Sequence, residues 1–452
     1  MAGAEDMTGA ARQCTAGSAT RPPAAGPVPL RRNRDFMMLW SSQVMSTVGT
    51  RVTSIAFPLL VLAVTHSPAE AGVVGFAQTL PFLLLYLPAG AFIDRWDRKR
   101  TMLACDAGRA VALGSIAMTV ALGWLSMAQV VVAALIDGSL FVLFDLAEGA
   151  ALPQLVTGEQ LPAAVAQNQA KSQGADVVGQ PLGGVLFSTA PLLPFLVDAV
   201  TYLVSFAALL FIRRPFQQPR AAARARLKTE IAEGLAWVWR QPFLRAAVGV
   251  IGGVNLVFNA LTLVLIVRAR ELGASPALIG AMFAFVGAGG LLGSFAAPWA
   301  QRRFGARRVV VTAGWLWVAQ IGVLVLLPNA LSLGVVSGFR SFAAPAFNVV
   351  VNSHVYRVTP ERLLGRVRSA ARLVAWGSIP LGALAGGFLA SACGAQATLL
   401  VLTGIMCAVA AAATLARGMR QLPSPSRAGK PPGNQLIDGD RDTCQTTGSN
   451  SS

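Results

Sequence analysis

The chain has 452 residues, of which 54% are hydrophobic and only 13% are charged. A soluble globular protein carries about 25% charged residues, so most of this protein's surface cannot face water. The composition therefore excludes an ordinary soluble protein and favours a helical protein embedded in a lipid bilayer. The net charge of +17 would indicate nucleic-acid binding in a soluble protein. In a membrane protein, Lys and Arg retained on the cytoplasmic side orient the helices instead, so we expect no nucleic-acid partner.

Apolar segments fill the chain between two polar tails, residues 1–35 and 417–452. Both tails lack an apolar run, so we expect them to be disordered and to carry no secretory signal. A membrane-spanning helix needs about 20 predominantly apolar residues. The sequence between the tails predicts twelve such spans: 36–64, 71–93, 101–124, 128–150, 163–188, 191–212, 246–267, 276–299, 307–327, 331–356, 365–391 and 395–416.

A basic segment, residues 213–245, is the only long polar connection between the predicted spans. It separates a first half, residues 36–212, from a second half, residues 246–416, with six spans in each. The halves share short patterns, because Pro-Leu-Gly occurs at residues 181–183 and again at residues 380–382. Internal repeats of this kind are typical of secondary transporters. We therefore interpret the chain as a duplicated six-helix unit.

The distribution of Lys and Arg predicts the orientation of the spans. If both termini are cytoplasmic, the outer loops contain only Arg268 and Arg270 of the 37 basic residues. Cytoplasmic loops carry an excess of Lys and Arg in multi-pass membrane proteins. The sequence thus predicts a multi-pass protein of the cell membrane, with both tails and the central loop in the cytoplasm.

The turn between the second and third spans places an acid among cations at a helix junction. It contains Gly90, Asp94, Arg95, Arg98 and Lys99. The glycine permits close approach of another helix, and the acid and cations are suited to a latch that breaks when helices move. The alternative is that these cations only anchor the topology.

This stretch resembles the signature of the major facilitator superfamily, Gly-x-x-x-Asp-Arg/Lys-x-Gly-Arg-Arg/Lys, with Asp97 replacing its last glycine. The resemblance implies an all-α membrane protein of twelve helices in two pseudo-symmetric six-helix halves. It also implies that Asp94 contacts the amino end of helix 11. The basic residues would engage an acid at the cytoplasmic end of helix 4, which is Asp145 or Glu148 here.

The fifth span resembles the antiporter signature of exporters in this superfamily, Gly-Pro-x-x-Gly-Gly. The residues that carry the likeness are Gly179, Pro181, Gly183 and Gly184, with Gln180 at the proline position of the signature. A plain packing face explains the glycines equally well. Together with Phe141, Asp145, Ala147 and Asp198-Ala199, the pattern resembles the drug:proton antiporters that include macrolide and siderophore exporters.

Charged residues inside the predicted spans are costly in a bilayer and therefore mark candidate functional sites. The superfamily resemblance implies that helices 1, 4, 7 and 10 line a central cavity. The candidates for the substrate and proton pathway are Arg51, Asp137, Asp176, Asp198, Asn255, Asn259 and Arg340. Arg51 and Asp137 are either a structural pair or a coupling switch, and both hypotheses stay open at this point. Lys171 is expected to be a surface cation that reaches toward water.

The predicted function is proton-coupled secondary active transport, with export of drugs or other small amphipathic molecules by alternating access. The expected partners are a small-molecule substrate, protons and the lipid bilayer, and the protein is expected to be monomeric. The alternatives are an importer or uniporter of a small solute and a non-transporting sensor on a transporter scaffold. The two histidines and five cysteines are scattered, so we expect neither an enzyme nor a metal or other cofactor.

Overall fold

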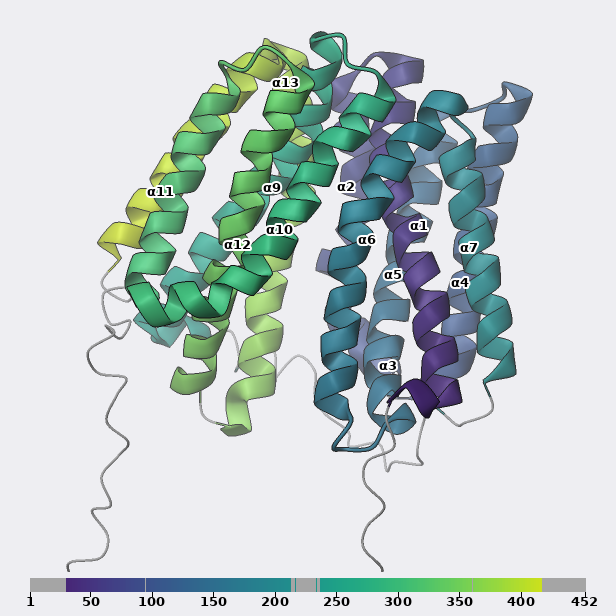
Figure 1. The fold of residues 1–452 in the computed structure, drawn as a ribbon, viewed down its shortest axis with the longest axis horizontal. Coiled ribbons are helices and arrows are strands. Elements are labelled where there is room, and N and C mark those ends of the chain that lie inside the picture. Colours follow the sequence, from purple (N-terminus) through teal and green to yellow (C-terminus); the bar gives the residue numbers. More distant parts are fainter. Residues whose placement is uncertain are drawn as a thin grey trace, which may run out of the picture.

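A computed structural model of the chain describes residues 30–93, 95–212, 236–359 and 361–416, together with Phe216 and Glu233. Residues 1–29 and 417–452 of the predicted tails and most of the predicted central loop therefore lie outside the described residues. Residues 30–35, which were predicted to belong to the disordered first tail, instead form a 3-10 helix and the start of the first long helix. Regular structure within the described residues is helical, which confirms the all-α prediction. A short 3-10 helix, Leu30–Arg32, precedes the long helices (Figure 1). These are α1 (Arg34–Thr65), α2 (Pro68–Leu84), α3 (Tyr86–Ile93), α4 (Arg98–Leu122), α5 (Met127–Leu155), α6 (Leu161–Thr189), α7 (Leu193–Phe211), α9 (Pro242–Glu271), α10 (Pro276–Phe304), α11 (Ala306–Leu324), α12 (Ala330–Val358) and α13 (Glu361–Leu415).

Polar caps fix where several helices begin and keep the connections short. The Ser126 side chain accepts a hydrogen bond from the Gln129 amide at 3.3 Å, and Asp97 accepts one from the Arg100 amide at 2.8 Å. Such side chains satisfy amide groups that have no partner within the helix. Gly394, with φ of 77°, turns the chain inside α13 and divides it into residues 361–393 and 395–415. A positive φ of this kind is readily adopted by glycine.

Eight helices of the described residues are long and apolar enough to cross a membrane by length and composition. They are α1, α4, α5, α7, α9, α10, α12 as far as Val355, and α13 from Ala375. The 29 residues of α6 are long enough but include Gln, Asn, Lys and Asp side chains. The second predicted span is divided between α2 and α3, where the Leu85 amide donates to the Pro81 carbonyl at 2.8 Å. A polar face on α6 is expected if that helix borders a cavity rather than lipid.

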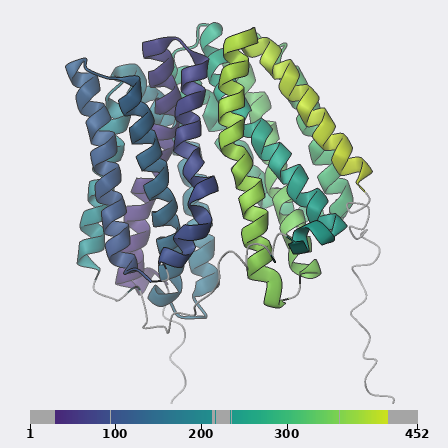
Figure 2. The same ribbon diagram turned by 180° about the vertical axis from the view of Figure 1, so that it is seen from behind.

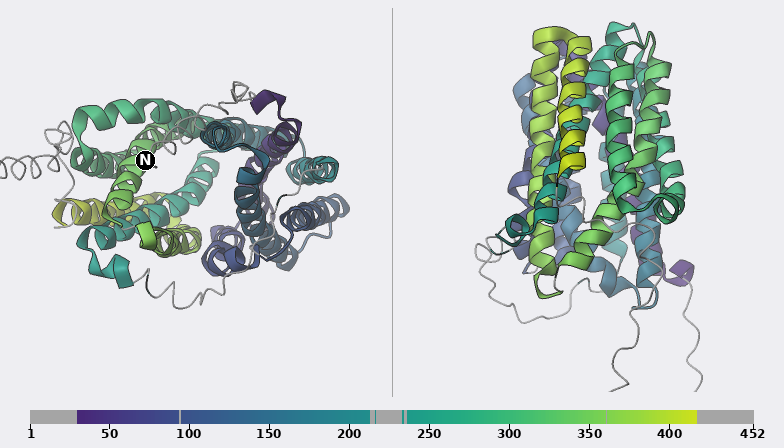
Figure 3. Two further views of the ribbon diagram at one scale, coloured as in Figure 1. Left: turned by 90° about the horizontal axis from the view of Figure 1, so that it is seen from below. Right: turned by 90° about the vertical axis from the view of Figure 1, so that its left-hand side faces the viewer.

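The helices pack as two groups, α1–α7 and α9–α13, which we call the first and second groups (Figures 1 and 3). Extensive contact between the groups comes from α6 against α10 and from α2 against α13 (Figure 2). Because successive helices run in opposite directions, their connections alternate between two ends of the bundle. We call the end that contains the α3–α4, α5–α6 and α10–α11 connections the basic end, since Arg98, Lys99 and Arg307 lie there. The other is called the opposite end.

Glycine contacts join the two groups toward the opposite end. A Cβ atom added at Gly72 of α2 would lie 2.9 Å from the Gly387 Cα of α13. A Cβ added at Gly184 of α6 would lie 2.7 Å from the Gly280 Cα of α10. Real Cβ atoms do not approach backbone atoms so closely. The backbones of the two groups can therefore meet in this way only if these positions are glycine.

Candidate functional site

Three adjoining cavities lie where the two groups face each other. The first, of about 660 Å³, is bounded by α6, α10 and α12, and we call it the amide cavity. Its polar lining includes Gln169, Gln173, Gln180, Gln301 and Asn348. Since Gln301 lies in the last turn of α10, this cavity extends toward the basic end. Amide side chains both donate and accept hydrogen bonds, so the lining suits neutral polar groups of a ligand.

The other two cavities have volumes of about 380 Å³ each. The arginine cavity is bounded mainly by α1, α2, α5 and α13, and Arg109 and Asp137 are in its lining. The apolar cavity is bounded mainly by α1, α2 and α9, and its lining includes Phe57 and Phe283. Arg51 lines both of these cavities, which places its side chain at their junction.

Arg51 of α1 forms an ion pair with Asp176 of α6, with 2.7 Å between Nε and Oδ1. The two side chains retain 38% and 29% of their accessible surface, because they face the cavities. Asp176 lines the amide cavity, so the pair stands where the three cavities meet. The sequence-based hypothesis of a pair between Arg51 and Asp137 is wrong for this structure. The position of a charge within a predicted span indicates its depth in the membrane, but it does not indicate the direction in which the helix presents the side chain.

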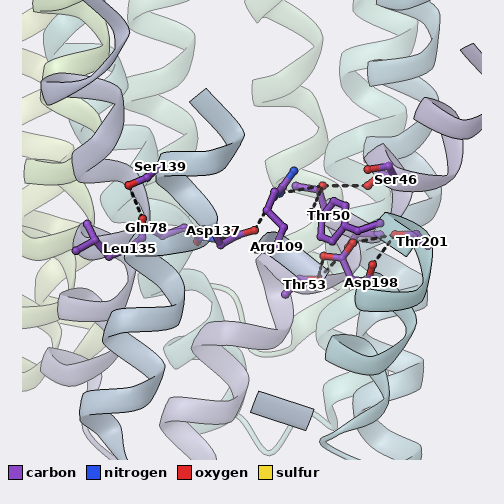
Figure 4. Close-up of polar contacts among 12 residues, drawn as sticks. Ser46, Thr50, Thr53, Gln78, Arg109, Leu135, Asp137, Ser139, Asp198 and Thr201 are labelled. Atoms are coloured by element: carbon purple, nitrogen blue, oxygen red, sulfur yellow. Dashed lines mark hydrogen bonds and ion pairs between the residues drawn. The ribbon is translucent and has the colours of Figure 1, made fainter. Parts of the chain in front are cut away.

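Asp137 of α5 pairs instead with Arg109 of α4, with 2.8 Å between Oδ1 and Nε (Figure 4). Both side chains are buried. Gln78 of α2 donates to the other carboxylate oxygen at 3.2 Å. The Arg109 guanidinium also lies over the Tyr202 ring, 4.2 Å from its centroid. Arg109 was missed by the sequence analysis, although a charge within the predicted span 101–124 was a sufficient reason to include it.

Asp198 of α7 belongs to a buried seam between α1 and α7 (Figure 4). Its carboxylate accepts hydrogen bonds from the hydroxyls of Thr53 and Thr201. Nearby, the Thr50 and Tyr202 hydroxyls lie 2.9 Å apart. Asp198 is absent from the linings of the three cavities. Asp198 is therefore better placed to hold α1 against α7 than to contact a substrate.

Two of the three basic residues of the predicted latch, Arg98 and Lys99, bind carbonyl groups near the carboxyl ends of α5 and α7. Arg98 donates to the Ala150 carbonyl at 2.8 Å, and Lys99 donates to the Ile212 carbonyl at 2.7 Å. Cations are favourable at carboxyl ends of helices, where carbonyl groups lack partners. Arg95 is exposed. Asp94 lies outside the described residues, so its predicted contact with helix 11 stays a prediction.

The two acids proposed to engage the latch have other partners in this structure. Asp145 accepts a hydrogen bond from the Tyr86 hydroxyl at 2.5 Å, and Glu148 forms an ion pair with Lys171 at 2.8 Å. The prediction that Lys171 reaches toward water is wrong, because its side chain is only 6% exposed. At Gly90, an added Cβ would meet no described atom within 4 Å, so the expected close approach is not present in this structure.

The antiporter-like residues of α6 form the contact faces of that helix. Gly179 and Gly183 pack on α1, where a Cβ added at Gly183 would lie 2.7 Å from Ile55 Cγ2. Pro181 lies between them inside the helix. Gly184, described above, meets α10 of the second group. The motif therefore provides the packing face that the alternative hypothesis expected, and it also joins the two groups.

The second group presents a buried cation and a pair of asparagines. The Arg340 guanidinium of α12 lies over the Phe258 ring, 4.4 Å from its centroid, and has no ion-pair partner among the described residues. Asn255 donates to the Ala375 carbonyl at 2.7 Å, which joins α9 to α13. Asn259 donates to the Asn255 carbonyl at 3.0 Å and lines the apolar cavity. The described residues include no group of His, Cys, Asp and Glu that could hold a metal ion.

The buried Arg109–Asp137 pair generates a stability prediction. Asp137→Asn leaves the Arg109 charge without its counter-charge, and such a loss costs about 3–5 kcal/mol. The double variant Arg109→Gln/Asp137→Asn removes both charges and should regain most of that stability. Arg51→Gln, at the more exposed pair, should cost only about 0–1 kcal/mol. Unfolding of the purified proteins in detergent measures these differences. Equal losses in all three variants would contradict the distinction between the two pairs.

Comparison with known proteins identifies the family. Residues 24–437 match the family described as "Transmembrane secretion effector". The chain is 28% identical over 404 residues to the multidrug efflux pump Tap of Mycolicibacterium fortuitum, covering 86% of this chain and 97% of that protein. It is 28% identical to the multidrug efflux pump Tap of Mycobacterium tuberculosis, covering 82% and 90%. It is also 26% identical to the MFS-type transporter YfiS of Bacillus subtilis, covering 82% and 91%.

Solved structures show the same fold at much lower sequence identity. The nucleoside transporter NupG superposes with a TM-score of 0.70 at 13% identity, covering 86% of this chain and all of that chain. A bacterial homologue of the lysosomal transporter Spinster, inward-facing and occupied, gives a TM-score of 0.69 at 14% identity, covering 88% and 100%. The chain therefore belongs to the transmembrane secretion effector family of the major facilitator superfamily, and it is a multi-pass membrane transporter rather than an enzyme.

Proposed function

We propose that the protein is a proton-coupled exporter of drugs or other small amphipathic molecules that works by alternating access. The observation that carries the proposal is the set of adjoining cavities between the two helix groups, which are joined by glycine contacts toward the opposite end. The names of the Tap relatives support the choice of export and of drug-like substrates.

The proposed topology has twelve spans, in halves 36–212 and 246–416, with both termini and the loop 213–245 in the cytoplasm. Two features support this count: α2 with α3 occupies one predicted span, and the turn at Gly394 divides α13 into two. The cations at the basic end support a cytoplasmic assignment of that end. On this assignment the amide cavity is accessible from the cytoplasm, and the present conformation faces inward.

An amphipathic substrate matches the walls of the arginine cavity. The aromatic rings of Phe82 and Phe141 have centroids 5.6 Å apart, and those of Phe82 and Trp376 are 6.1 Å apart. These rings provide apolar surface for one face of a ligand, while Gln78 and Thr79 line the same cavity with polar groups. Apolar walls with a few polar groups are typical of sites for drug-sized molecules.

Coupling to protons is proposed to involve the carboxylates of the first group. Asp176 meets Arg51 where the cavities join, so protonation of Asp176 would release Arg51 to contact a substrate. Asp137 and Asp198 are proposed to act within the protein interior, one through Arg109 and the other through the α1–α7 seam. A proton that binds one conformation more tightly than the other biases the equilibrium between them, which is the requirement for coupling. Arg340, Asn255 and Asn259 are proposed to line the pathway from the second group.

The first test of this proposal is drug resistance. A hypersensitive bacterial host that expresses the chain should grow at higher concentrations of several amphipathic toxins than a host with the empty vector. A protonophore should abolish the difference, because it removes the proton gradient. Growth across a panel of compounds measures the effect. Greater sensitivity would indicate import, and unchanged growth across the whole panel would contradict transport of drugs.

The second test concerns the glycine contacts that join the groups. Gly184→Val forces α6 away from α10, and overpacking a tight contact costs about 1–3 kcal/mol. The substitution should therefore shift the population toward a conformation open at the opposite end. Reaction of an Ile266→Cys reporter in the apolar cavity with an impermeant thiol reagent, added from outside, should increase. The reporter is placed in a background where all five native cysteines, Cys14, Cys105, Cys393, Cys407 and Cys444, are serine.

Gly404→Val is the matched control for this experiment. An added Cβ at Gly404 meets no described atom within 4 Å, so the reporter should react as it does in the parent protein. Equal labelling of the Gly184→Val and Gly404→Val proteins would contradict the proposal that the contact between α6 and α10 keeps the opposite end closed.

A further inference from the structure

Asp106 of α4 is a fully buried carboxylic acid that has no role in the function proposed above. Its exposed fraction is 0%, and neither of its carboxyl oxygens forms a hydrogen bond in the part of the chain that the structure describes. It has no ion-pair partner among the described residues. An ionised carboxylate buried without a partner costs several kcal/mol. This environment therefore favours the neutral, protonated acid.

The charged groups that face Asp106 are already engaged with other partners. On α4 itself these include Arg109, which is held by Asp137 of α5 at 2.8 Å. From α5 the carboxylate of Glu148 faces it, and this group is paired with Lys171 of α6 at 2.8 Å. The neighbouring Cys105 thiol adds no positive charge. Arg109 favours ionisation of Asp106, but its guanidinium is already engaged with Asp137, and the negative charge of Glu148 opposes ionisation. Burial has the largest effect, and it favours the neutral acid.

A polar path leads from the arginine cavity to Asp106. Gln43 of α1 lines this cavity, and its Nε2 donates to the Ser205 Oγ of α7 at 2.9 Å. Ser205 faces the Asp106 carboxyl without completing a hydrogen bond of ordinary geometry. Since the Ser205 oxygen accepts from Gln43, its own hydrogen remains available to a carboxylate. Gln43 and Ser205 therefore provide polar groups along which a proton carried by water can reach or leave Asp106.

We propose that Asp106 is a proton-binding site of this transporter and holds one proton in the present conformation. On release, the proton leaves a carboxyl oxygen for a water molecule, and the remaining carboxylate takes Arg109 as its counter-charge. Arg109 lies three residues further along α4, a spacing that places two side chains on the same helix face. Asp137 then loses its partner, so proton release changes the contact between α4 and α5. This role in transport rests on the proposed proton coupling, whereas the proton itself is detected independently of transport.

Infrared spectroscopy of the full chain in lipid vesicles tests for the proton. An ordinary Asp has a pKa of about 3.9, so its carboxyl group is ionised at pH 7. A protonated aspartic acid is therefore distinguished at this pH by the infrared carbonyl stretch of its neutral carboxyl group. Labelling aspartate with ¹³C at the side-chain carboxyl should shift this band in the wild-type protein. Asp106→Asn should remove the component of the band that Asp106 contributes, whereas the matched Asp176→Asn should retain that component.

Ser205→Ala provides a second variant that leaves the acid in place. It should alter the frequency of the band without removing it, because the polar environment of the carboxyl changes. Absence of an aspartic-acid band from the wild-type protein would overturn the proposal even if Asp106→Asn fails to fold. Persistence of the band at its full wild-type intensity in a folded Asp106→Asn protein would overturn it as well.

Transport of ethidium in the same vesicles tests the coupling role. Asp106→Asn mimics the protonated acid, so it should move ethidium down its gradient and lose the stimulation that a pH step gives the wild type. Stimulation equal to that of the wild type would overturn the role of Asp106 in coupling. If the wild-type protein transports neither ethidium nor any toxin of the resistance panel, the proposed function fails, and the infrared band still decides whether Asp106 carries a proton.

Discussion

A charged side chain inside a bilayer has no bulk water to stabilise it, so it must find an opposite charge or a polar partner on another helix. The first group meets this constraint with ion pairs that each join different helices: α1 to α6, α4 to α5, and α5 to α6. The same contacts that satisfy the charges therefore fix the relative positions of the helices. Any movement that separates two of these helices has to exchange a proton, a substrate or another side chain for the lost partner. That requirement is a physical basis for coupling.

The glycine contacts impose a second constraint, and they occur in matching places in the two groups. Gly183 of α6 packs on α1, and Gly184 beside it meets α10; correspondingly, Gly386 of α13 packs on α9, and Gly387 beside it meets α2. In each pair, the first glycine thus packs its helix against a helix of the same group, and the second glycine packs that helix against a helix of the other group. Contacts between glycine backbones involve little interlocking of side chains, so they can part without repacking a core. This arrangement suits a joint that opens and closes.

Apolar runs allowed the sequence to predict where the helices lie, because such a run is a property of neighbouring residues in the chain. Charge partners depend on the rotation of each helix and on which helix lies beside it, and a single sequence carries little information on either. For that reason Arg51 was associated with Asp137, and Lys171 was assigned to the surface, although Asp176 and Glu148 are their partners. Arg109 and Asp106 were missed because they lie in the third span, which the superfamily resemblance did not place at the cavity. The motif glycines of α6 were found, but only three-dimensional contacts show that Gly179 and Gly183 face α1 whereas Gly184 joins the two groups.

The asymmetry between the groups favours the first group as the location of the proposed proton coupling. In the second group, Arg340 lies against the Phe258 ring and forms no ion pair with a carboxylate of the described residues. Protonation of an acid paired with Arg340 therefore cannot act as a switch among these residues. In the first group Arg109 contacts Asp137 and lies one helical turn from Asp106, and Asp137 is linked through Gln78 to α2. The same helix α2 carries Gly72, which meets Gly387 of the other group. Only Asp137 and Gln78 therefore separate Arg109 from the helix that makes this glycine contact. The proton that we propose at Asp106 of α4 would thus be connected through these contacts to the surface along which the two groups move in the proposed transport cycle.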